Sequence, residues 1–492
     1  MTLVIDGHPY RCGMENLCRV FYPFEKITSA EPGAADGGEP AVYTGMALED
    51  GITRVTVRLR AGGKTREKTE AFGRQGADPE KEAGRRMAVL LYELLAAERG
   101  MRPQWGILTG VRPVKLFGSL CETMGEGEAS AYFQRKLLVS PRKTELCRVT
   151  LENEKKILAC VRPEYFSLYL SIPFCPTRCA YCSFVSSSVE KTFRLIPEYV
   201  RLLCKEIEET GRVAAALGLR PASVYMGGGT PTTLSAEQLG AVLDAVRSSF
   251  DLSACHEVTV EAGRPDTITE DRLEAMKSRG VTRISINPQT LSDRVLRAIG
   301  RRHTTEQTFS AFEMARRGGF DNINMDLIAG LPKDDPEGFR ATLKGVADLA
   351  PESVTVHTLA LKRAARLAKD PAGPYGGNAD GTEEMVDFAD SFLPEKGYAP
   401  YYLYRQSRMV GNLENVGWAL PGRECAYNVF IMEECQTILA CGAGAVTKLK
   451  APGSGRLERV FNFKYPYEYI SRYAEMLNRK GRVKEFYDGC TR

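Results

Sequence analysis

The stretch "FSLYLSIPFCPTRCAYC", residues 166–182, joins a strand-like segment to a loop with three cysteines. Its first seven residues are mostly aromatic and aliphatic, which is typical of a short buried strand. The prolines that follow cannot donate to a strand ladder, so they end the strand. Cys175, Cys179 and Cys182 then occur with C-x3-C-x2-C spacing. We therefore expect three close thiols at the carboxyl end of a strand.

Three thiols at this spacing indicate a metal centre, either structural zinc or an iron–sulfur cluster. Structural zinc needs four closed ligands, and no second Cys/His pair lies near the loop. A [4Fe–4S] cluster has four irons, so three thiolates leave one iron open to a small molecule. A chance grouping of structural thiols is the remaining alternative. The spacing favours the cluster.

From residue 166 onward, strand-like segments alternate with helical ones. This alternation predicts a parallel α/β barrel or an open partial barrel, in which functional residues gather at the carboxyl ends of the strands. The six predicted strands are 166–172, 222–228, 257–262, 283–287, 323–330 and 353–359.

The segments on either side of the barrel differ from it in pattern. Short strand-like runs and an amphipathic helix at 78–100 predict an N-terminal α+β domain over 1–160, of unknown role. The barrel core is expected over 161–368. A Gly/Pro-rich break begins at 369. Residues 369–492 are therefore expected to form a small α+β extension that covers the barrel mouth.

The composition is that of an ordinary globular protein. Hydrophobic residues make up 43%, charged residues 26%, and the net charge of +4 gives no reason to expect a nucleic-acid partner. No apolar stretch is long enough to span a bilayer, and no secretory signal is evident at the N-terminus. Eleven of the 14 cysteines lie outside the triplet and are mostly isolated, which favours buried thiols in a reducing cytoplasm.

A glycine run ends the second predicted strand, in "YMGGGTPTTL" (225–234). Three glycines allow a ligand to approach the backbone closely. They are also expected to leave backbone N–H groups free for a carboxylate or an amine.

Together, the cysteine loop and the glycine run resemble those of radical S-adenosylmethionine (SAM) enzymes. This resemblance implies that Cys175, Cys179 and Cys182 bind a [4Fe–4S] cluster whose fourth iron takes the amino and carboxylate groups of SAM. The reduced cluster would cleave SAM to methionine and a 5′-deoxyadenosyl radical. Tyr181 occupies the place of an aromatic residue near the adenine.

Further motifs resemble the oxygen-independent coproporphyrinogen III oxidase branch (HemN/HemW-like) of that family. These are "TVEAGRP", "RISINPQTL", "GRRH" and "NINMDLIAGLP", with Asn287 and Pro288 in place of a usual Gly-Val. His303 is part of the third motif. The resemblance implies SAM contacts from Tyr169, Tyr181, Gly228, Gly229, Thr230, Glu261, Gln289, Arg301 and Asp326.

The long N-terminal domain and the runs "HTLALKR" (357–363) and "NLENVGW" (412–418) resemble the HemZ subgroup, the coproporphyrinogen dehydrogenase-like proteins. The resemblance implies oxidative decarboxylation of coproporphyrinogen III to protoporphyrinogen IX in heme biosynthesis. His357, Lys362 and Arg363 are cationic candidates for binding propionates; solvated side chains at a helix start are the alternative for Lys362 and Arg363. An electron donor such as flavodoxin or ferredoxin is implied as a partner.

One departure leaves a second function open. Characterised oxidases of the branch carry a further cysteine soon after the third, whereas this chain has Ser183 and Phe184 after Cys182. Heme chaperones of the HemW group lack that cysteine as well. A heme-binding chaperone or transfer protein without oxidase activity is therefore the alternative to the oxidase.

Overall fold

The computed structural model describes residues 1–23, 25–33, 38–73, 78–110, 112–182, 187–362, 365, 367, 379–406 and 408–490. The chain forms two compact units. One comprises Met1–Leu151 and Tyr404–Glu414, and the other comprises Glu152–Leu403 and Asn415–Arg492. Among the described residues, no helix has both the length and the apolar character needed to cross a bilayer.

The first unit contains a five-stranded sheet in the order β2-β1-β3-β4-β5. β1 is parallel to β2 and β3, and β3–β5 form an antiparallel meander. β4 alternates buried and exposed residues, so one face of the sheet packs on the core formed with α1 and α2. The elements are β1 (Thr2–Asp6), α1 (Arg11–Phe21), β2 (Thr28–Ala30), β3 (Ala41–Glu49), β4 (Ile52–Ala61), β5 (Lys64–Gly73) and α2 (Pro79–Arg99).

Three further helices, α3 (Pro113–Met124), α4 (Glu126–Lys136) and α5 (Pro141–Leu158), follow α2. Residues 404–414, much later in the sequence, are also part of this first unit. A buried ion pair joins them to α5. The Lys143 ammonium lies 2.5 Å from the Glu414 carboxylate, and Trp105 Nε1 donates to the other carboxylate oxygen.

The second unit is built on an 11-stranded sheet whose central strands run β13-β12-β11-β10-β9-β6. These six strands pair in parallel, which confirms the predicted barrel topology. They are β6 (Tyr165–Ile172), β9 (Arg220–Gly228), β10 (Glu257–Glu261), β11 (Arg283–Ser285), β12 (Ile323–Ala329) and β13 (Ser353–Thr358).

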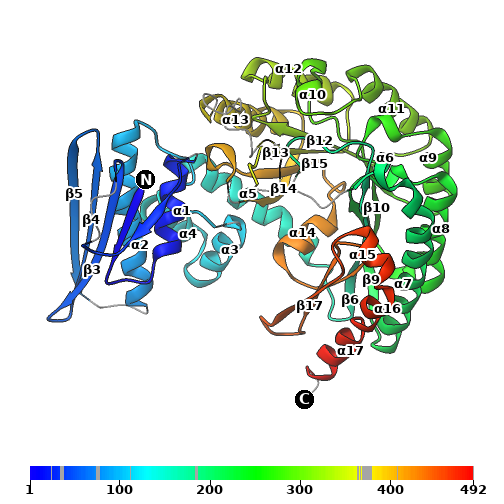
Figure 1. Ribbon diagram of the computed structural model, residues 1–492, viewed down its shortest axis with the longest axis horizontal. Helices are drawn as coiled ribbons and strands as arrows, with labels where there is room; N and C mark the ends of the chain where they lie inside the picture. Colours follow the sequence, from blue (N-terminus) through cyan, green and yellow to red (C-terminus); the bar gives the residue numbers. More distant parts are fainter. Residues whose placement is uncertain are drawn as a thin grey trace. The chain divides into compact units, whose positions relative to one another are not determined.

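Helices cover the outside of these strands, as Figure 1 shows. Their starts are set locally: Ser235 and Thr304 form capping boxes, and Asp335 caps the helix that begins with Pro336. The helices are α7 (Ile196–Ala216), α8 (Ala236–Ser249), α9 (Glu270–Lys277), α10 (Asp293–Ala298), α11 (Thr305–Arg317), α12 (Pro336–Asp348) and α13 (Ala379–Glu395).

The two faces of the barrel strands differ sharply in polarity. On β6 the residues Phe166, Leu168 and Leu170 are fully buried on the face that the helices cover. The alternate residues are Ser167, Tyr169 and Ser171, and they are in register with Ser223, Tyr225 and Gly227 of β9. The lumen of the barrel is therefore lined with polar side chains.

The C-terminal residues, expected as a separate extension from 369, extend the barrel sheet instead. β15 pairs antiparallel with β13, and β16 pairs in parallel with β6, so backbone hydrogen bonds join them to the barrel. The chain consequently has two compact units rather than the three expected. These elements are β14 (Ala399–Tyr404), β15 (Asn415–Ala419), α14 (Ala426–Glu433), β16 (Thr437–Cys441), β17 (Val446–Lys450), β18 (Leu457–Phe461), α15 (Pro466–Ser471), α16 (Tyr473–Asn478) and α17 (Gly481–Asp488).

Candidate functional site

The cysteine loop leaves the carboxyl end of β6, where the sequence predicts it. Its short strand β7 (Phe174–Cys175) pairs with β8 (Ser187–Ser188). Within the loop, the Cys182 N–H donates to the Cys179 carbonyl. Ala180 is held from two sides, since its N–H donates to Ile299 and its carbonyl accepts from Leu367 N–H. The loop is thus tied to two distant parts of the same unit.

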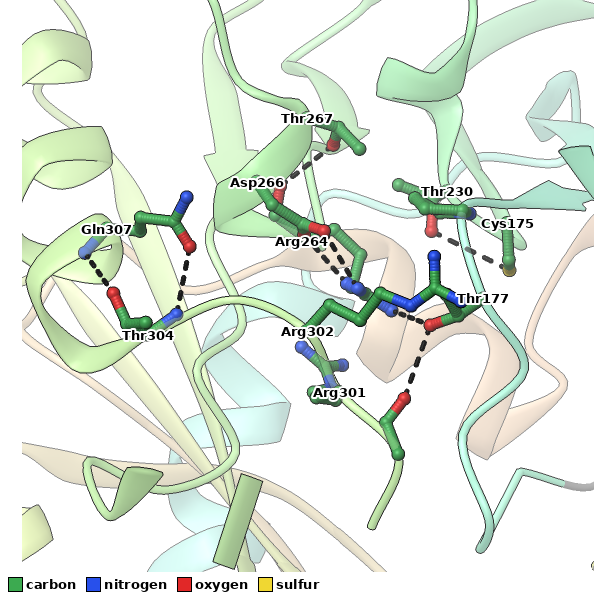
Figure 2. A network of polar contacts seen from close by, with 12 residues as sticks. Cys175, Thr177, Thr230, Arg264, Asp266, Thr267, Arg301, Arg302, Thr304 and Gln307 are labelled. Carbon is green, nitrogen blue, oxygen red and sulfur yellow. Dashed lines mark hydrogen bonds and ion pairs between the residues drawn. The ribbon is translucent and has the colours of Figure 1, made fainter. Parts of the chain in front are cut away.

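Two side chains from outside the loop lie near the cysteines. The Thr230 hydroxyl lies 3.7 Å from the Cys175 sulfur (Figure 2). The buried guanidinium of Arg301 donates to the Asn287 carbonyl at 2.6 Å. Cys179 and Tyr181 are close enough to shift its pKa. Burial alone would lower the pKa of Arg301, but these two neighbours raise it, so the side chain stays cationic beside the loop.

Arg264 clamps the middle of the cysteine loop (Figure 2). Its guanidinium forms a two-pronged pair with the Asp266 carboxylate, with both N···O distances at 2.9 Å. The remaining nitrogen donates to the Thr177 hydroxyl at 3.0 Å, and that hydroxyl donates to the Gly300 carbonyl. Arg264 is 3% exposed, so these bonds are made in a dry environment.

The glycine run needs glycine at all three positions. A Cβ on Gly227 would lie 2.8 Å from the Glu261 carboxyl carbon, and one on Gly229 would lie 2.5 Å from the Phe174 carbonyl oxygen. Gly228 has φ of 105°, in the region that favours glycine. The run therefore allows the second strand, the cysteine loop and Glu261 to approach one another closely.

The sequence predicts free backbone N–H groups in the glycine run. This prediction is wrong for Gly228, Gly229 and Thr230, whose N–H groups all have partners. The Gly229 N–H donates to the Ile172 carbonyl, the Thr230 N–H donates to the Phe174 carbonyl, and the Gly228 N–H hydrogen-bonds to Glu261. These bonds satisfy buried donors locally and fasten the glycine run to the cysteine loop.

Glu261 and Asp326 face the lumen from β10 and β12 and have opposite pKa shifts. Burial raises the pKa of Glu261 to about 7, with the Tyr225 hydroxyl opposing the shift and the charge of Asp326 adding to it. Burial alone would also raise the pKa of Asp326, but hydrogen bonds and the charge of His357 hold it below its usual range. One carboxyl is consequently poised to titrate near neutrality while the other stays ionised.

A hydrogen-bonded chain connects Asp326 with the neighbouring strands. The Asn324 amide donates to Ser285 Oγ at 3.0 Å and to Asp326 Oδ1 at 2.7 Å. Its carbonyl oxygen accepts from Ser353 and Thr355. Because both ends of the Asn324 amide are satisfied, the position of Asp326 is set by three adjacent strands.

Gln289 has a left-handed backbone, with φ of 70°. Its N–H donates to the Asp326 carbonyl, and its carbonyl accepts from Ile328 N–H. Two backbone bonds to β12 therefore hold a conformation that a non-glycine residue rarely adopts, and such strain is often found at functional sites.

Three tyrosines stack across the lumen. Tyr169 and Tyr225 come from adjacent barrel strands, and Tyr427 comes from the first turn of α14. The Tyr225 and Tyr427 ring centroids are 4.5 Å apart with an interplanar angle of 21°, and Tyr427 also stacks on Tyr169. The C-terminal segment thus contributes a side chain to the barrel interior.

The remaining cationic candidates have different surroundings. His357 Nε2 lies 3.7 Å from Asp326 Oδ2. Burial lowers the pKa of Lys362, and the thiol of Cys182 opposes that shift, so Lys362 lies near the cysteine loop. The pKa of His303 is lowered to about 3 by burial together with Arg301 and Arg264. Arg363 lies outside the described residues.

The predicted site residues therefore gather at the carboxyl ends of β6, β9, β10, β11 and β12, but the sequence analysis missed several partners. Arg264, Tyr225 and Asn324 lie within the motifs "TVEAGRP", "YMGGGTPTTL" and "NINMDLIAGLP", but no role was predicted for them. Their alternating positions on strands could have placed Tyr225 and Asn324 in the lumen. Tyr427 had no such signal, because it enters from a distant segment.

The donor set fits an iron–sulfur cluster and SAM. Soft thiolates select iron–sulfur clusters, and each thiolate binds a different iron. Among the described residues, no three or more His, Cys, Asp or Glu side chains lie close enough together to hold a single metal ion, and a [4Fe–4S] cluster does not require this because its three thiolates bind three different irons. For SAM, which carries cationic and anionic groups, the site offers the carboxyls of Glu261 and Asp326 and the guanidinium of Arg301. Arg301 Nε is buried and makes no hydrogen bond to any described residue.

Comparisons with known proteins agree with this geometry. Residues 169–345 match the radical SAM superfamily. The chain is 36% identical over 484 residues to the oxygen-independent coproporphyrinogen-III oxidase-like protein HemZ of Bacillus subtilis, covering 96% of this chain and 95% of that protein. It is 30% identical over 312 residues to the heme chaperone HemW of Escherichia coli, covering 63% of this chain and 77% of that protein.

A solved structure is also similar. It is coproporphyrinogen III oxidase (HemN) from Escherichia coli, a radical SAM enzyme, with a TM-score of 0.53 and 25% identity, covering 65% of this chain and 72% of that chain. Radical SAM proteins use a [4Fe–4S] cluster and SAM, and these are the cofactors of this chain. On its sequence, fold and donor set, the chain belongs to the radical SAM family of oxygen-independent coproporphyrinogen-III oxidase-like proteins that includes HemZ.

Proposed function

We propose that the protein is a coproporphyrinogen dehydrogenase. It removes two propionate carboxyl groups of coproporphyrinogen III oxidatively, without oxygen, to give the vinyl groups of protoporphyrinogen IX in heme biosynthesis. The observation that carries the proposal is the Glu261–Asp326 carboxyl pair in the lumen of a barrel that also carries the cysteine loop, in a chain 36% identical to HemZ over 96% of its length. The similarity to HemN supports the same reaction class.

The cofactors and the protein divide the work. When bound, the cluster and SAM supply a 5′-deoxyadenosyl radical that takes a hydrogen atom from the substrate. The protein would hold SAM through opposite charges, with the carboxyls of Glu261 and Asp326 toward cationic groups and Arg301 toward an anionic one. The cluster ligands would be Cys175, Cys179 and Cys182, and the SAM-binding residues Tyr169, Tyr181, Gly228, Gly229, Thr230, Glu261, Gln289, Arg301 and Asp326.

Substrate binding would use the polar lumen and the cationic side chains at its rim. Coproporphyrinogen III carries propionates, and Lys362 and His357 are the candidate cations that would bind them. Lys362 lies near the cysteine loop, and His357 lies near Asp326. For each vinyl group, a propionate loses one hydrogen atom to the radical, CO2, and one electron that passes to a one-electron acceptor. The protein's part is to hold the propionate β-carbon close to the radical and to exclude water.

The reaction also needs a cytoplasmic one-electron donor, such as a flavodoxin or ferredoxin, to reduce the cluster. The barrel and its donor set are compatible with such a carrier, since the cysteine loop lies at the open ends of the strands and not in the core of the sheet.

Product analysis tests the proposal. The reconstituted protein is incubated anaerobically with SAM, dithionite and coproporphyrinogen III. We expect 5′-deoxyadenosine together with vinyl products, and neither of them from Cys179→Ala, which should also lose the cluster absorbance near 400 nm. Cluster formation and SAM cleavage without any vinyl product would contradict the proposal.

The second candidate is a heme chaperone, favoured by the 30% identity to HemW and by Ser183 after the third cysteine. Heme titration of the same preparation distinguishes the two. Stoichiometric heme binding without turnover of coproporphyrinogen III would support the chaperone, whereas turnover with weak heme binding would support the dehydrogenase.

A further inference from the structure

A cavity of about 620 Å³ lies directly beside the cysteine loop. Thr177 and Arg178 of that loop line one side, and Arg297, Arg301 and Arg302 line another. We propose that this cavity is the docking surface for an acidic one-electron carrier protein that reduces the cluster. The inference rests on the proposed function only in requiring a reducible cluster at this loop.

The charge of the cavity favours an anionic partner. Its lining includes four arginines and two carboxylates, those of Glu190 and Asp293. Glu190 pairs with Arg302 at 3.0 Å, but both side chains are more than half exposed, so the pair is weak and can be exchanged for another carboxylate. Asp293 accepts hydrogen bonds from the N–H and hydroxyl of Thr305, which together with the charge of Arg297 lower its pKa. It therefore stays ionised, and the lining keeps two more arginines than carboxylates.

The cavity wall and the cluster ligands belong to the same piece of chain. Thr177 and Arg178 lie between Cys175 and Cys179 in sequence. Arg301 lines the cavity and lies near Cys179, which contributes to the raised pKa of its guanidinium. Figure 2 shows Arg301 and Arg302 in the same region as Thr177 and Cys175. A carrier seated here would approach the cluster with the cysteine loop between them.

The placement of the charges favours a protein over a small anion. Of the four lining arginines, only Arg301 is buried. Arg178, Arg297 and Arg302 are exposed, so most of the charge faces outward and not into an enclosed small-molecule site. Exposed charges spread over two segments act mainly by steering an oppositely charged surface and raising its association rate. The surface therefore fits the acidic face of a small redox protein.

Charge reversal tests the inference. In stopped-flow experiments, an anaerobically reduced bacterial flavodoxin bleaches the cluster absorbance near 400 nm of the reconstituted protein. We expect the R178E/R297E/R302E variant to react at least ~10-fold more slowly at low salt, with a weaker dependence on ionic strength. Reduction by dithionite should keep its rate. The R297E/R302E variant leaves the cysteine loop intact and should show the same direction of change.

A matched control reverses three exposed arginines on the outer helices, R201E/R212E/R317E, and should react like the wild type. An unchanged flavodoxin rate in both cavity variants would overturn the inference, as would equal slowing in the control. Calorimetric titration with flavodoxin before reconstitution gives a second readout, and binding lost only in the cavity variants supports docking. Slowed reduction by flavodoxin in a protein that makes no vinyl product would leave the docking surface standing and reject the proposed function.

Discussion

Glu261 and Asp326 carry the same chemical group into the same lumen, yet their surroundings shift their pKa values in opposite directions. Glu261 is buried against Tyr225 with the charge of Asp326 nearby, and its pKa rises to about 7. Asp326 accepts a hydrogen bond from Asn324 and faces His357, and its pKa falls. The shared environment therefore gives one carboxyl that can exchange a proton near neutrality and one that stays charged.

The stability of the ligand-free protein should report the Glu261 shift. A carboxyl group whose pKa is raised in the folded state makes its full contribution to stability at pH values below the ordinary pKa of glutamate. This contribution is lost as the pH rises through about 7. Glu261→Gln should therefore be more stable than the wild type by about 1–3 kcal/mol near pH 8, and by little near pH 5. Thermal unfolding at the two pH values measures this.

Asp326→Asn is the matched control, and its effect should have the opposite sign. The lowered pKa of Asp326 stabilises the fold above the ordinary pKa of aspartate, and this contribution is lost in acid, so the variant should be less stable at neutral pH. If Glu261→Gln lowered the stability at both pH values, the assigned direction would be contradicted.

At the scale of elements, the cysteine loop is held by side chains from elsewhere in the barrel. Arg264 follows β10 and reaches Thr177, and Thr230 follows β9 and reaches Cys175. The stacking of Tyr427 on Tyr225 similarly joins α14 to β9. Each contact links segments far apart in sequence, so the loop geometry depends on the completed barrel.

Truncating Arg264 should loosen the loop and the cluster with it. Arg264→Ala removes the bond to Thr177 and leaves the partly buried Asp266 carboxylate without its partner, at a cost of about 2 kcal/mol. We expect less iron after reconstitution and several-fold faster loss of the cluster absorbance to a chelator. Arg279→Ala removes a more exposed arginine–carboxylate pair and serves as the control. Chelation at the wild-type rate in Arg264→Ala would refute the clamp.

At the scale of the whole molecule, the chain passes between its two units more than once. It enters the second unit at Glu152, returns to the first at Tyr404 and leaves it again after Glu414. Within the first unit the Lys143–Glu414 pair is fully buried. The C-terminal half of the sequence therefore contributes to the stability of the N-terminal unit.

Breaking this pair should destabilise the first unit strongly. Glu414→Ala removes the carboxylate that lies against the buried Lys143 ammonium, which we expect to cost about 3–5 kcal/mol. Replacing both partners by apolar residues, as in Lys143→Met with Glu414→Leu, should recover most of the loss. Arg58→Ala, which breaks an exposed pair with Glu67 in the same unit, should cost less than about 1 kcal/mol. Calorimetry would contradict this reasoning if Glu414→Ala and Arg58→Ala had the same effect.

Much of the barrel could be predicted because its information is local. Alternating strands and helices, capping residues and the cysteine spacing all act over a few residues, and each of the six predicted strands is present. The role of the segment after 369 could not be predicted in this way. Its strands join the sheet through hydrogen bonds to β6 and β13, and the paired residues are 60 or more positions apart in sequence.

By itself, the sequence determined the barrel class, the thiol triplet and the strand ends at which Glu261, Gln289 and Asp326 lie, because periodicity and spacing act along the chain. Only the tertiary structure decided the opposite pKa shifts of the two carboxyls, the clamp of Arg264 on the cysteine loop and the cationic cavity beside it. Those properties come from burial and from charges brought together by folding, which no short stretch of sequence contains.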